Sequence, residues 1–400
     1  MTSRGRAALV IGLTAFLAAR LFGSQPLYPV AFGLVLAVGL GWLWVRLASG
    51  PGRLGRLVPA GSRFEGDDVG IDVRLELAGI VPPPSVTLVE RVGKAGEVTA
   101  ALSRWSGFLA GGYLLPGLRR GRYVFEGSRV VIEDPFGFAR TEVNVPAPAA
   151  LLVYPRLVTV ERLFVDGSPA ATDGRRLVLQ RPSGFDLHSV REYEHGESLR
   201  RVHWPSTAKR GELMVKELED APRDEVAVVL DADARFVAGE SFDAQVRAAG
   251  SVLDAHVARG RRCVLMVNGA EREVQRVHSQ GDRRRALDLL AAVEPDGRTS
   301  LAALLRDETG APGLAAELTV VTASPAPELA EVLMRRAAGR RRAAVVFVDA
   351  PTFAPGSANR VPNPQLLRLQ SAGVPVAVLR AGDDLQAVLS AAGSAAVAGG

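Results

Sequence analysis

Ionisable side chains gather in the middle of the chain, where they could act in acid–base chemistry. Glu192, His195 and His203 could supply a general acid and a general base, since an imidazole titrates near neutral pH. Nothing in their spacing isolates a nucleophile paired with a base, and the sequence contains no Gly-x-Ser-x-Gly or His-Glu-x-x-His motif. We therefore expect a binding protein rather than an enzyme, and a hydrolase that uses these three residues is the alternative.

A second candidate site follows the apolar run 226–230. Asp231 and Asp233 offer carboxylate oxygens at alternate positions, which suits a hard cation such as Mg²⁺. Arg235 comes two residues later, and its guanidinium could pair with these carboxylates and take the place of a cation. We expect no cofactor, and a divalent-metal-dependent adhesion module at Asp231 and Asp233 is a further alternative.

The C-terminal part of the chain must position these carboxylates. Its short apolar runs alternate with helical stretches, which indicates a parallel sheet covered on both faces. The expected strands are 226–230, 263–267, 318–322, 343–348 and 374–379. The expected helices are 242–258, 284–293, 301–306, 328–338 and 364–371. The ligand crevice of such folds lies at the carboxyl ends of the strands, where Asp231, Asp233, Ser324 and Asp349 stand.

The preceding region, 61–155, has a different pattern. From Val69 to Leu77, every second residue is apolar, which is the period of a half-buried strand. Similar runs follow, separated by turn residues such as Pro116-Gly117, and no helix-length amphipathic run occurs. We expect a small antiparallel β-sandwich there, after a polar linker that follows Gly52.

The first fifty residues contain the two most apolar stretches. Residues 27–45 carry no formal charge and would span roughly 30 Å as a helix, enough to cross a hydrocarbon core. The run 7–19 is shorter, but Arg20 can direct its charge outward and the short turn 23–26 joins the two stretches. We expect a transmembrane helical hairpin.

The cations give an expected orientation. Arginines precede the first stretch and follow the second, so the positive-inside rule places both outer ends, and the soluble body, in the cytoplasm. The chain is thus expected to be a multi-pass protein of the inner membrane. The alternative is a cleaved signal peptide over 4–19, after which the stretch that begins at Leu27 would still anchor the product.

The remaining composition excludes several classes. The net charge is only +5, and no aromatic residues interleave with the clusters 283–285 and 340–342, so we expect no nucleic-acid partner. These arginine clusters could contact anionic membrane lipids. Cys263 is the single cysteine, which excludes an internal disulfide, and its apolar surroundings indicate a small buried side chain.

An ordered set of motifs gives the chain a family resemblance. Gly184 is followed by Arg191-x-Tyr193-x-x-Gly196-Glu197, then by Arg200, Trp204, Lys209 and Leu213-x-Val215-Lys216-Glu217. This order closely resembles the signature of the bacterial domain-of-unknown-function 58 (DUF58) family. Upstream, Gly121-Arg122-Tyr123, residues 134–138 (DPFGF) and Val153-Tyr154-Pro155 resemble the other short markers of that family.

The resemblance implies a two-helix anchor, a β domain and a three-layer α/β domain similar to von Willebrand factor A domains. The expected parts are the hairpin at 1–50, the β-sandwich at 61–155, the signature segment at 156–222 and the α/β domain at 223–395. Metal-binding domains of that type carry Asp-x-Ser-x-Ser after the first strand. Here Asp233 replaces the first Ser and Arg235 replaces the second, which weakens the metal hypothesis.

The resemblance also implies partners. Members commonly accompany a MoxR-type AAA+ ATPase and often transglutaminase-like membrane proteins. We therefore expect a membrane-anchored scaffold or adaptor that acts with such an ATPase in assembling or remodelling envelope-associated complexes. The candidate interaction residues are those of the signature, namely Arg191, Tyr193, Gly196, Glu197, Arg200, Trp204, Lys209, Lys216 and Glu217.

Individual signature residues also have structural interpretations. Arg191 and Arg200 could join carboxylates in a buried network that holds two domains together. Trp204 is interpreted as a core anchor, and Tyr193 as a packed side chain whose hydroxyl finds a partner.

Overall fold

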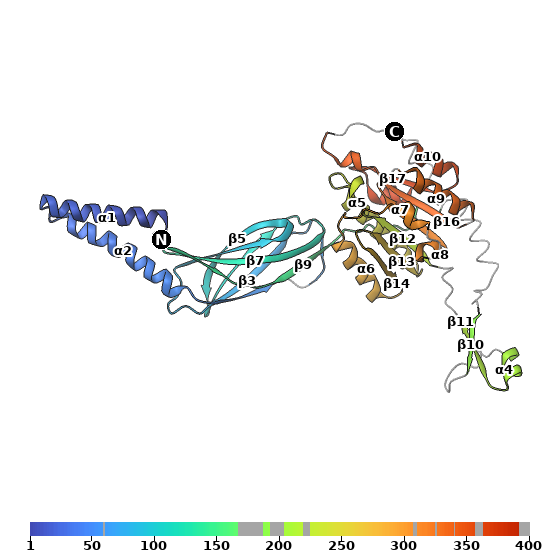
Figure 1. Ribbon diagram of the computed structural model, residues 1–400, viewed down its shortest axis with the longest axis horizontal. Coiled ribbons are helices and arrows are strands. Elements are labelled where there is room, and N and C mark those ends of the chain that lie inside the picture. The colour runs from blue at the N-terminus through green and yellow to red at the C-terminus, as the bar shows by residue number, and fades with distance from the viewer. Residues whose placement is uncertain are drawn as a thin grey trace. The chain divides into compact units, whose positions relative to one another are not determined.

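The computed structural model describes residues 1–58, 61–166, 187–192, 204–218, 225–306, 310–324, 326–339, 341–356 and 363–391. The chain divides into two compact units, Met1–Tyr154 and Pro155–Gly400. The first contains two helices and a curled β-sheet, and the second contains a hairpin and an α/β domain (Figure 1).

Two antiparallel helices open the first unit. They are α1 (Ser3–Phe22) and α2 (Leu27–Ala48), and both are long and apolar enough to cross a membrane. Gly12 lets α1 approach α2, where its nearest neighbours are on Ala31, Leu34 and Val35. The outward surfaces of both helices carry exposed apolar side chains over most of their length. The helical hairpin therefore agrees with the apolar runs in the sequence.

Nine strands follow in one curled sheet. They are β1 (Gly52–Leu57), β2 (Arg63–Phe64), β3 (Val69–Leu77), β4 (Ser85–Val92), β5 (Gly96–Trp105), β6 (Phe108–Leu115), β7 (Gly121–Glu133), β8 (Arg140–Asn144) and β9 (Ala149–Tyr154). The order is β1-β3-β6-β5-β4-β7-β9-β2, with β8 also paired to β7. All pairs are antiparallel except β2 with β9.

The long strand β5 joins the two halves of this sheet. Residues 96–102 pair with β4, and residues 103–105 pair with β6, so the sheet curls around a single apolar core. The expected sandwich thus takes the form of one hydrogen-bonded sheet. The prediction of a polar linker after Gly52 is wrong, because residues 52–57 form β1. The glycines and arginines of this strand gave it the composition of a linker.

A buried ion pair lies in this β domain. The Arg56 and Glu90 side chains are 5% and 0% exposed, and Arg56 Nη2 lies 2.5 Å from Glu90 Oε1. Ser128 and Tyr113 hydroxyls also donate to the carboxylate, at 2.6 and 2.5 Å. Burial alone would raise the pKa of Glu90, but the hydrogen bonds from Arg56, Ser128 and Tyr113 outweigh it and lower that pKa.

The substitution Glu90→Gln would leave the buried Arg56 charge without its counterion, so we expect it to lower the unfolding free energy by about 3–5 kcal/mol at neutral pH. Because the folded-state pKa of Glu90 is lowered, this stabilisation is present above the ordinary glutamate range and is lost as the pH falls through the folded-state pKa. The difference between wild type and variant should therefore shrink in acid.

Thermal unfolding of the full chain in detergent, at neutral and acidic pH, measures this difference. Glu142→Gln is the matched control, because Glu142 and its partner Arg140 are about half exposed and their pair should contribute little. Equal unfolding temperatures for Glu90→Gln and Glu142→Gln at neutral pH would contradict the assignment.

The end of α2 is joined closely to the sheet. Ile80 N donates to Leu47 O at 2.8 Å, and Ala78 N donates to Pro51 O at 3.0 Å. A side chain at Gly79 would collide with the carbonyl of Ala48, so this approach of two backbones requires glycine. The helical hairpin and the sheet are therefore held together by main-chain contacts.

We expect Gly79→Ala to weaken this junction, because the added methyl group meets backbone atoms that cannot rotate away. The unfolding free energy should fall by about 1–3 kcal/mol, the usual effect of overpacking. Gly70→Ala in β3 is the control, since nothing lies within 4 Å of its added methyl group. Equal thermal stability of the two variants would show that the junction does not restrain the hairpin.

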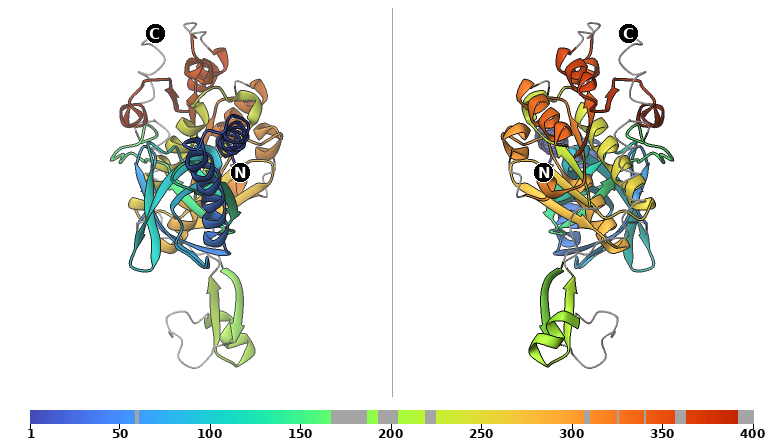
Figure 2. Two further views of the ribbon diagram at one scale, coloured as in Figure 1. Left: turned by 90° about the vertical axis from the view of Figure 1, so that its left-hand side faces the viewer. Right: turned by 90° about the vertical axis from the view of Figure 1, so that its right-hand side faces the viewer.

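The second unit begins with residues that pack on its α/β domain and continues with a hairpin. Val158 N donates to Ser251 Oγ at 3.0 Å, and Phe164 is buried in the domain core. The hairpin consists of β10 (Leu187–Glu192), α4 (Trp204–Arg210) and β11 (Met214–Leu218). Strands β10 and β11 form their own antiparallel two-stranded sheet, so part of the signature segment has regular structure (Figure 2).

The α/β domain has a six-stranded sheet. Its strands are β12 (Val226–Asp231), β13 (Cys263–Asn268), β14 (Arg272–Val277), β15 (Glu317–Thr322), β16 (Arg342–Val348) and β17 (Val376–Leu379), in the order β14-β13-β12-β15-β16-β17. Only the edge strand β14 is antiparallel. The five parallel strands confirm the expectation from apolar runs, and β14 was missed because its sequence is mostly polar.

Helices cover both faces of this sheet. They are α5 (Ser241–Ala258), α6 (Gln280–Ala292), α7 (Leu301–Leu305), α8 (Ala311–Leu314), α9 (Pro327–Ala338), α10 (Pro364–Ser371) and α11 (Leu385–Ser390). Val226, Val228 and Leu230 of β12 belong to the core under α5, α6 and α11. Ala227 and Val229 belong to the core under α7, α9 and α10. Successive side chains of β12 therefore enter the two cores in turn, and the domain has three layers: helices, sheet and helices.

Candidate functional site

The strand order places a candidate site at the end of β12. From β12 the chain moves first to β13 and β14 on one side, and then to β15, β16 and β17 on the other. The carboxyl end of β12 is thus the point where the direction of winding changes, which is where such sheets hold their ligands. Asp231 is the last residue of β12, Asn268 of β13 and Thr322 of β15.

These three side chains form a buried hydrogen-bonded cluster. Asn268 Nδ2 donates to Asp231 Oδ1 at 3.2 Å, and Thr322 Oγ1 donates to Asp231 Oδ2 at 2.7 Å. Asn268 Nδ2 also donates to the carbonyl of Thr299 at 2.9 Å, and Thr322 Oγ1 accepts from Ser324 N at 2.9 Å. Both carboxylate oxygens of Asp231 therefore have a donor from a neighbouring strand.

Asp233 forms a separate pair with Arg235. Its two carboxylate oxygens accept from Arg235 Nε at 3.0 Å and from Arg235 Nη2 at 2.6 Å. The Asp233 side chain is 4% exposed, whereas that of Arg235 is 61% exposed. The ion pair suggested by the sequence is present, and the guanidinium covers the carboxylate from the solvent side.

The two carboxyl groups differ in their titration. Burial raises the pKa of Asp231, and the hydrogen bonds from Thr322 and Asn268 only partly offset it. Burial also opposes ionisation of Asp233, but the hydrogen bonds and the charge of Arg235 outweigh it and lower that pKa. The Asp233–Arg235 pair is neutral as a whole, so Asp233 adds no net charge to this edge.

This donor set does not fit a divalent cation. Such a cation needs several free oxygen ligands, yet Arg235 occupies the oxygens of Asp233 and two donors occupy those of Asp231. Within the ranges that the structure describes, no three His, Cys, Asp or Glu side chains gather into a metal-binding group.

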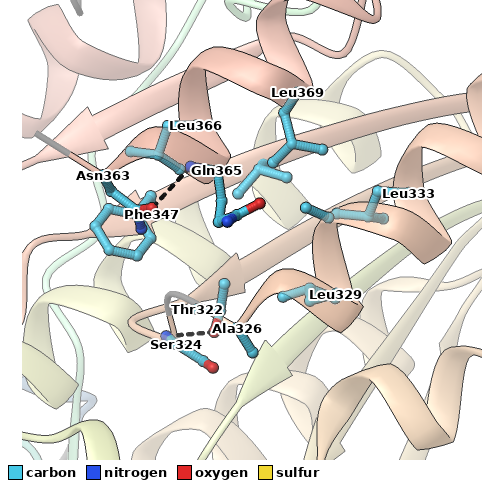
Figure 3. Close-up of a pocket in the computed structure, with 12 residues that line it drawn as sticks. Thr322, Ser324, Ala326, Leu329, Leu333, Phe347, Asn363, Gln365, Leu366 and Leu369 are labelled. Carbon is cyan, nitrogen blue, oxygen red and sulfur yellow. Dashed lines mark hydrogen bonds between the residues drawn. The ribbon is translucent and has the colours of Figure 1, made fainter.

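A small pocket adjoins the cluster between α9 and α10 (Figure 3). Thr322 and Ser324 line it at the strand edge, and Asn363 and Gln365 line it at the start of α10. The rest of the lining is apolar: Ala326, Leu329, Ala330, Leu333, Val345, Phe347, Leu366 and Leu369. Thr322 thus contributes to the Asp231 cluster and to the pocket wall.

The other residues expected at this edge are arranged differently. Ser324 contributes its backbone N–H, which donates to Thr322 as described above. Asp349 follows β16, and its Oδ2 lies 3.6 Å from Arg380 Nε. Asn268 and Thr322 were not predicted as site residues, although Asn268 directly follows the expected strand 263–267 and Thr322 ends the expected strand 318–322.

The signature residues are only partly described. Arg191 and Glu192 lie in β10 and Lys216 and Glu217 in β11, with Arg191 opposite Val215. Trp204 and Lys209 lie on α4 and are exposed. The interpretation of Trp204 as a core anchor is wrong, because the residue is 66% exposed. The remaining candidates, Tyr193, His195, Gly196, Glu197, Arg200 and His203, lie outside the described residues.

The arginine clusters and the cysteine also have defined surroundings. Arg283 pairs with Asp254 at 2.6 Å, and Arg342 lies 3.7 Å from the buried Glu317. Arg341 donates to the carbonyl of Gly313 at 2.6 Å. Cys263 is fully buried in β13, and burial raises the pKa of its thiol to about 12, so it is the small core side chain that the sequence indicated.

We expect calorimetric titration of the full chain with Mg²⁺ or Mn²⁺ to give no saturable heat, since Arg235 already neutralises Asp233. The variant Arg235→Ser removes that guanidinium and tests whether it excludes the cation. Weak binding that appears only in Arg235→Ser would agree with this account. Saturable binding by wild type that disappears in Asp231→Ala would instead establish a metal site.

Comparison with known proteins places these features in context. The model of the family described as "Protein of unknown function DUF58" matches residues 189–398. The uncharacterized protein YeaD of Bacillus subtilis (strain 168) is 27% identical over 218 residues, which are 52% of this chain and 52% of that protein. The chain thus spans about half the length of the curated relative it matches.

Two solved structures show similarity to part of the chain. The von Willebrand factor type A protein from Catenulispora acidiphila is 12% identical, with a TM-score of 0.28 over 42% of this chain and 40% of that chain. The conserved hypothetical protein BatB from Bacteroides thetaiotaomicron is 15% identical, with a TM-score of 0.30 over 41% of this chain and 93% of that chain.

Proposed function

The chain belongs to the DUF58 family, and we propose that it is a membrane-anchored binding protein without a catalytic centre of its own. In this proposal, α1 and α2 hold the chain in the bilayer, and the second unit carries the surfaces that bind other proteins. The apolar outer surface of α1 and α2 is the observation that carries the proposal.

The anchoring is argued from burial. Helices of 20 and 22 residues reach about 30 Å, which is the thickness of the hydrocarbon core. Side chains such as Ile11, Leu17, Phe32 and Leu36 are 58–61% exposed on them. Water would disfavour such a continuous apolar surface, whereas lipid chains would cover it. Trp42 and Trp44 then suit the polar boundary of the bilayer.

The orientation follows from the distribution of cations. Arg4 and Arg6 lie at the start of α1, and Arg46 lies at the end of α2. Only Arg20 is near the turn between the helices. The positive-inside rule therefore favours a cytoplasmic location for the two outer ends and for the rest of the chain.

The hairpin β10–α4–β11 is the proposed binding surface for a protein partner. Trp204 is 66% exposed and Leu213 is 41% exposed, and the cation Lys209 lies between them in the sequence. Exposed tryptophan is enriched among residues that dominate binding energy at protein interfaces. The hairpin itself is ordered by pairing of β10 with β11 and by a hydrogen bond from Met214 N to Thr207 Oγ1 at 3.0 Å.

A MoxR-type AAA+ ATPase is the proposed partner, and a transglutaminase-like membrane protein is a further one. Family resemblance supports both, since DUF58 proteins commonly accompany them. The chain would act as an adaptor that keeps the ATPase at the membrane while envelope-associated complexes are assembled or remodelled.

Affinity purification of the tagged full chain from gently solubilised native membranes, with nucleotide present, tests the partner. We expect wild type to recover a MoxR-type ATPase and Trp204→Ala to lose most of it. Leu314→Ala is the control, because Leu314 is a 47% exposed apolar residue on α8. Reproducible purification of wild type without any such ATPase, or equal recovery by Trp204→Ala, would count against the proposed interaction.

A further inference from the structure

One end of the curled sheet combines three loops with the ends of both helices. Strand β1 begins at Gly52, opposite Leu77 at the end of β3. Leu109 of β6 pairs with Leu75 of β3, so the turn between β5 and β6 lies at the same end. The pairing of Ser85 with Glu133 brings the end of β7 there as well. We call loops 78–84 and 134–138, together with the β5–β6 turn and its flanking strand ends at 104–108, the helix-proximal rim.

The rim exposes large apolar side chains. Ile80, Trp105 and Phe136 are 82%, 68% and 66% exposed, one in each loop. The Phe136 ring stacks on that of Phe138, with ring centroids 5.6 Å apart. Large hydrophobic side chains at the opposite end of the sheet are less exposed: Leu57, Val58, Phe64 and Leu114 are 38–57% exposed. The three most exposed large hydrophobic side chains of the β domain thus lie at the end of the sheet that adjoins the helices.

Hydrogen bonds fix the rim to the helix ends. Trp44 Nε1 donates to the carbonyl of Pro82 at 2.9 Å, close to the bond between Ile80 and Leu47 described above. Thr2 N donates to the carbonyl of Phe138 at 3.0 Å, just before α1 begins. The rim therefore lies level with the start of α1 and the end of α2, where membrane-spanning helices would leave the hydrocarbon core.

The charge of the rim suits a lipid surface. Its loops contain one acidic residue, Asp134, which is buried and accepts hydrogen bonds from the backbone N–H groups of Phe136 and Ala139. Exposed cations lie in the rim and at the adjoining helix ends, namely Arg4, Arg6, Arg46 and Arg104. Beside the rim, Arg140 pairs with Glu142, and Glu76 and Glu133 flank the loops. Apolar and aromatic side chains flanked by cations are the composition of segments that insert among anionic headgroups.

We propose that the helix-proximal rim lies in the interfacial layer of the bilayer, with Ile80, Trp105 and Phe136 inserted among the lipid headgroups. This inference rests on the proposed anchoring by α1 and α2. It assigns a role to the DPFGF motif at 134–138: Asp134 folds the loop, Phe136 and Phe138 enter the interface, and the Phe138 carbonyl binds the residue before α1. The β domain would then rest on the membrane surface.

Site-directed fluorescence of the full chain in vesicles tests the proposal. In a Cys263→Ala background, single cysteines replace Phe136 or Ile80 and carry an environment-sensitive nitrobenzoxadiazole label. Ala95→Cys, in the exposed turn at the opposite end of the sheet, is the matched control. Leu36→Cys, on the exposed surface in the middle of α2, reports the anchoring. All replaced positions except Cys263 are at the surface, where substitutions usually change stability little.

The vesicles contain phosphatidylcholine and phosphatidylglycerol, with nitroxide quenchers attached either to headgroups or deep in the acyl chains. We expect headgroup nitroxides to quench the labels at positions 80 and 136 several-fold more than the label at 95. The label at 36 should be quenched by the deep nitroxide.

If the label at 36 behaves as expected while those at 80 and 136 respond only to an aqueous quencher, as at 95, the rim proposal is overturned and the anchoring stands. If an aqueous quencher reaches the label at 36, the anchoring itself fails.

Discussion

The contact between the end of α2 and the loop after β3 determines how the first unit is built. Only three residues separate α2 from β1, and Ile80 N and Leu47 O close the junction at 2.8 Å. Gly79 is needed there because its α-carbon faces the carbonyl of Ala48. The apolar helices and the curled sheet are consequently joined without a flexible linker. The position of the helices in a bilayer would therefore also determine how far the sheet lies from the membrane surface.

At the carboxyl edge of the α/β sheet, the polar side chains are held by one another. Asp231 is held by Asn268 and Thr322, and Asp233 is held by Arg235. These side chains satisfy one another, which leaves no strong demand for a cation or a charged substrate. The exposed Trp204 on α4 is the feature on which the proposed binding of a protein partner depends.

Much of the fold could be predicted from apolar patterns, because continuous runs such as 226–230 and alternating runs such as 69–77 follow directly from burial. Strands β1 and β14 were missed since their sequences, GRLGRL and REVQRV, carry few apolar residues. The Asp233–Arg235 pair could be inferred because its partners are two residues apart. The Asp231–Asn268–Thr322 cluster could not, since only the strand order brings three distant residues together. The exposure of Trp204 could not be predicted either, because a large apolar side chain is expected in the core unless its surroundings are known.

The central claim is that α1 and α2 cross the membrane and hold the whole chain there. Extraction of native membranes with alkaline carbonate, followed by sedimentation and detection of the full chain, tests it most directly. The account predicts that the protein stays in the membrane pellet, because spanning helices are retained when peripheral contacts are broken. Release of most of the protein into the supernatant would contradict the account.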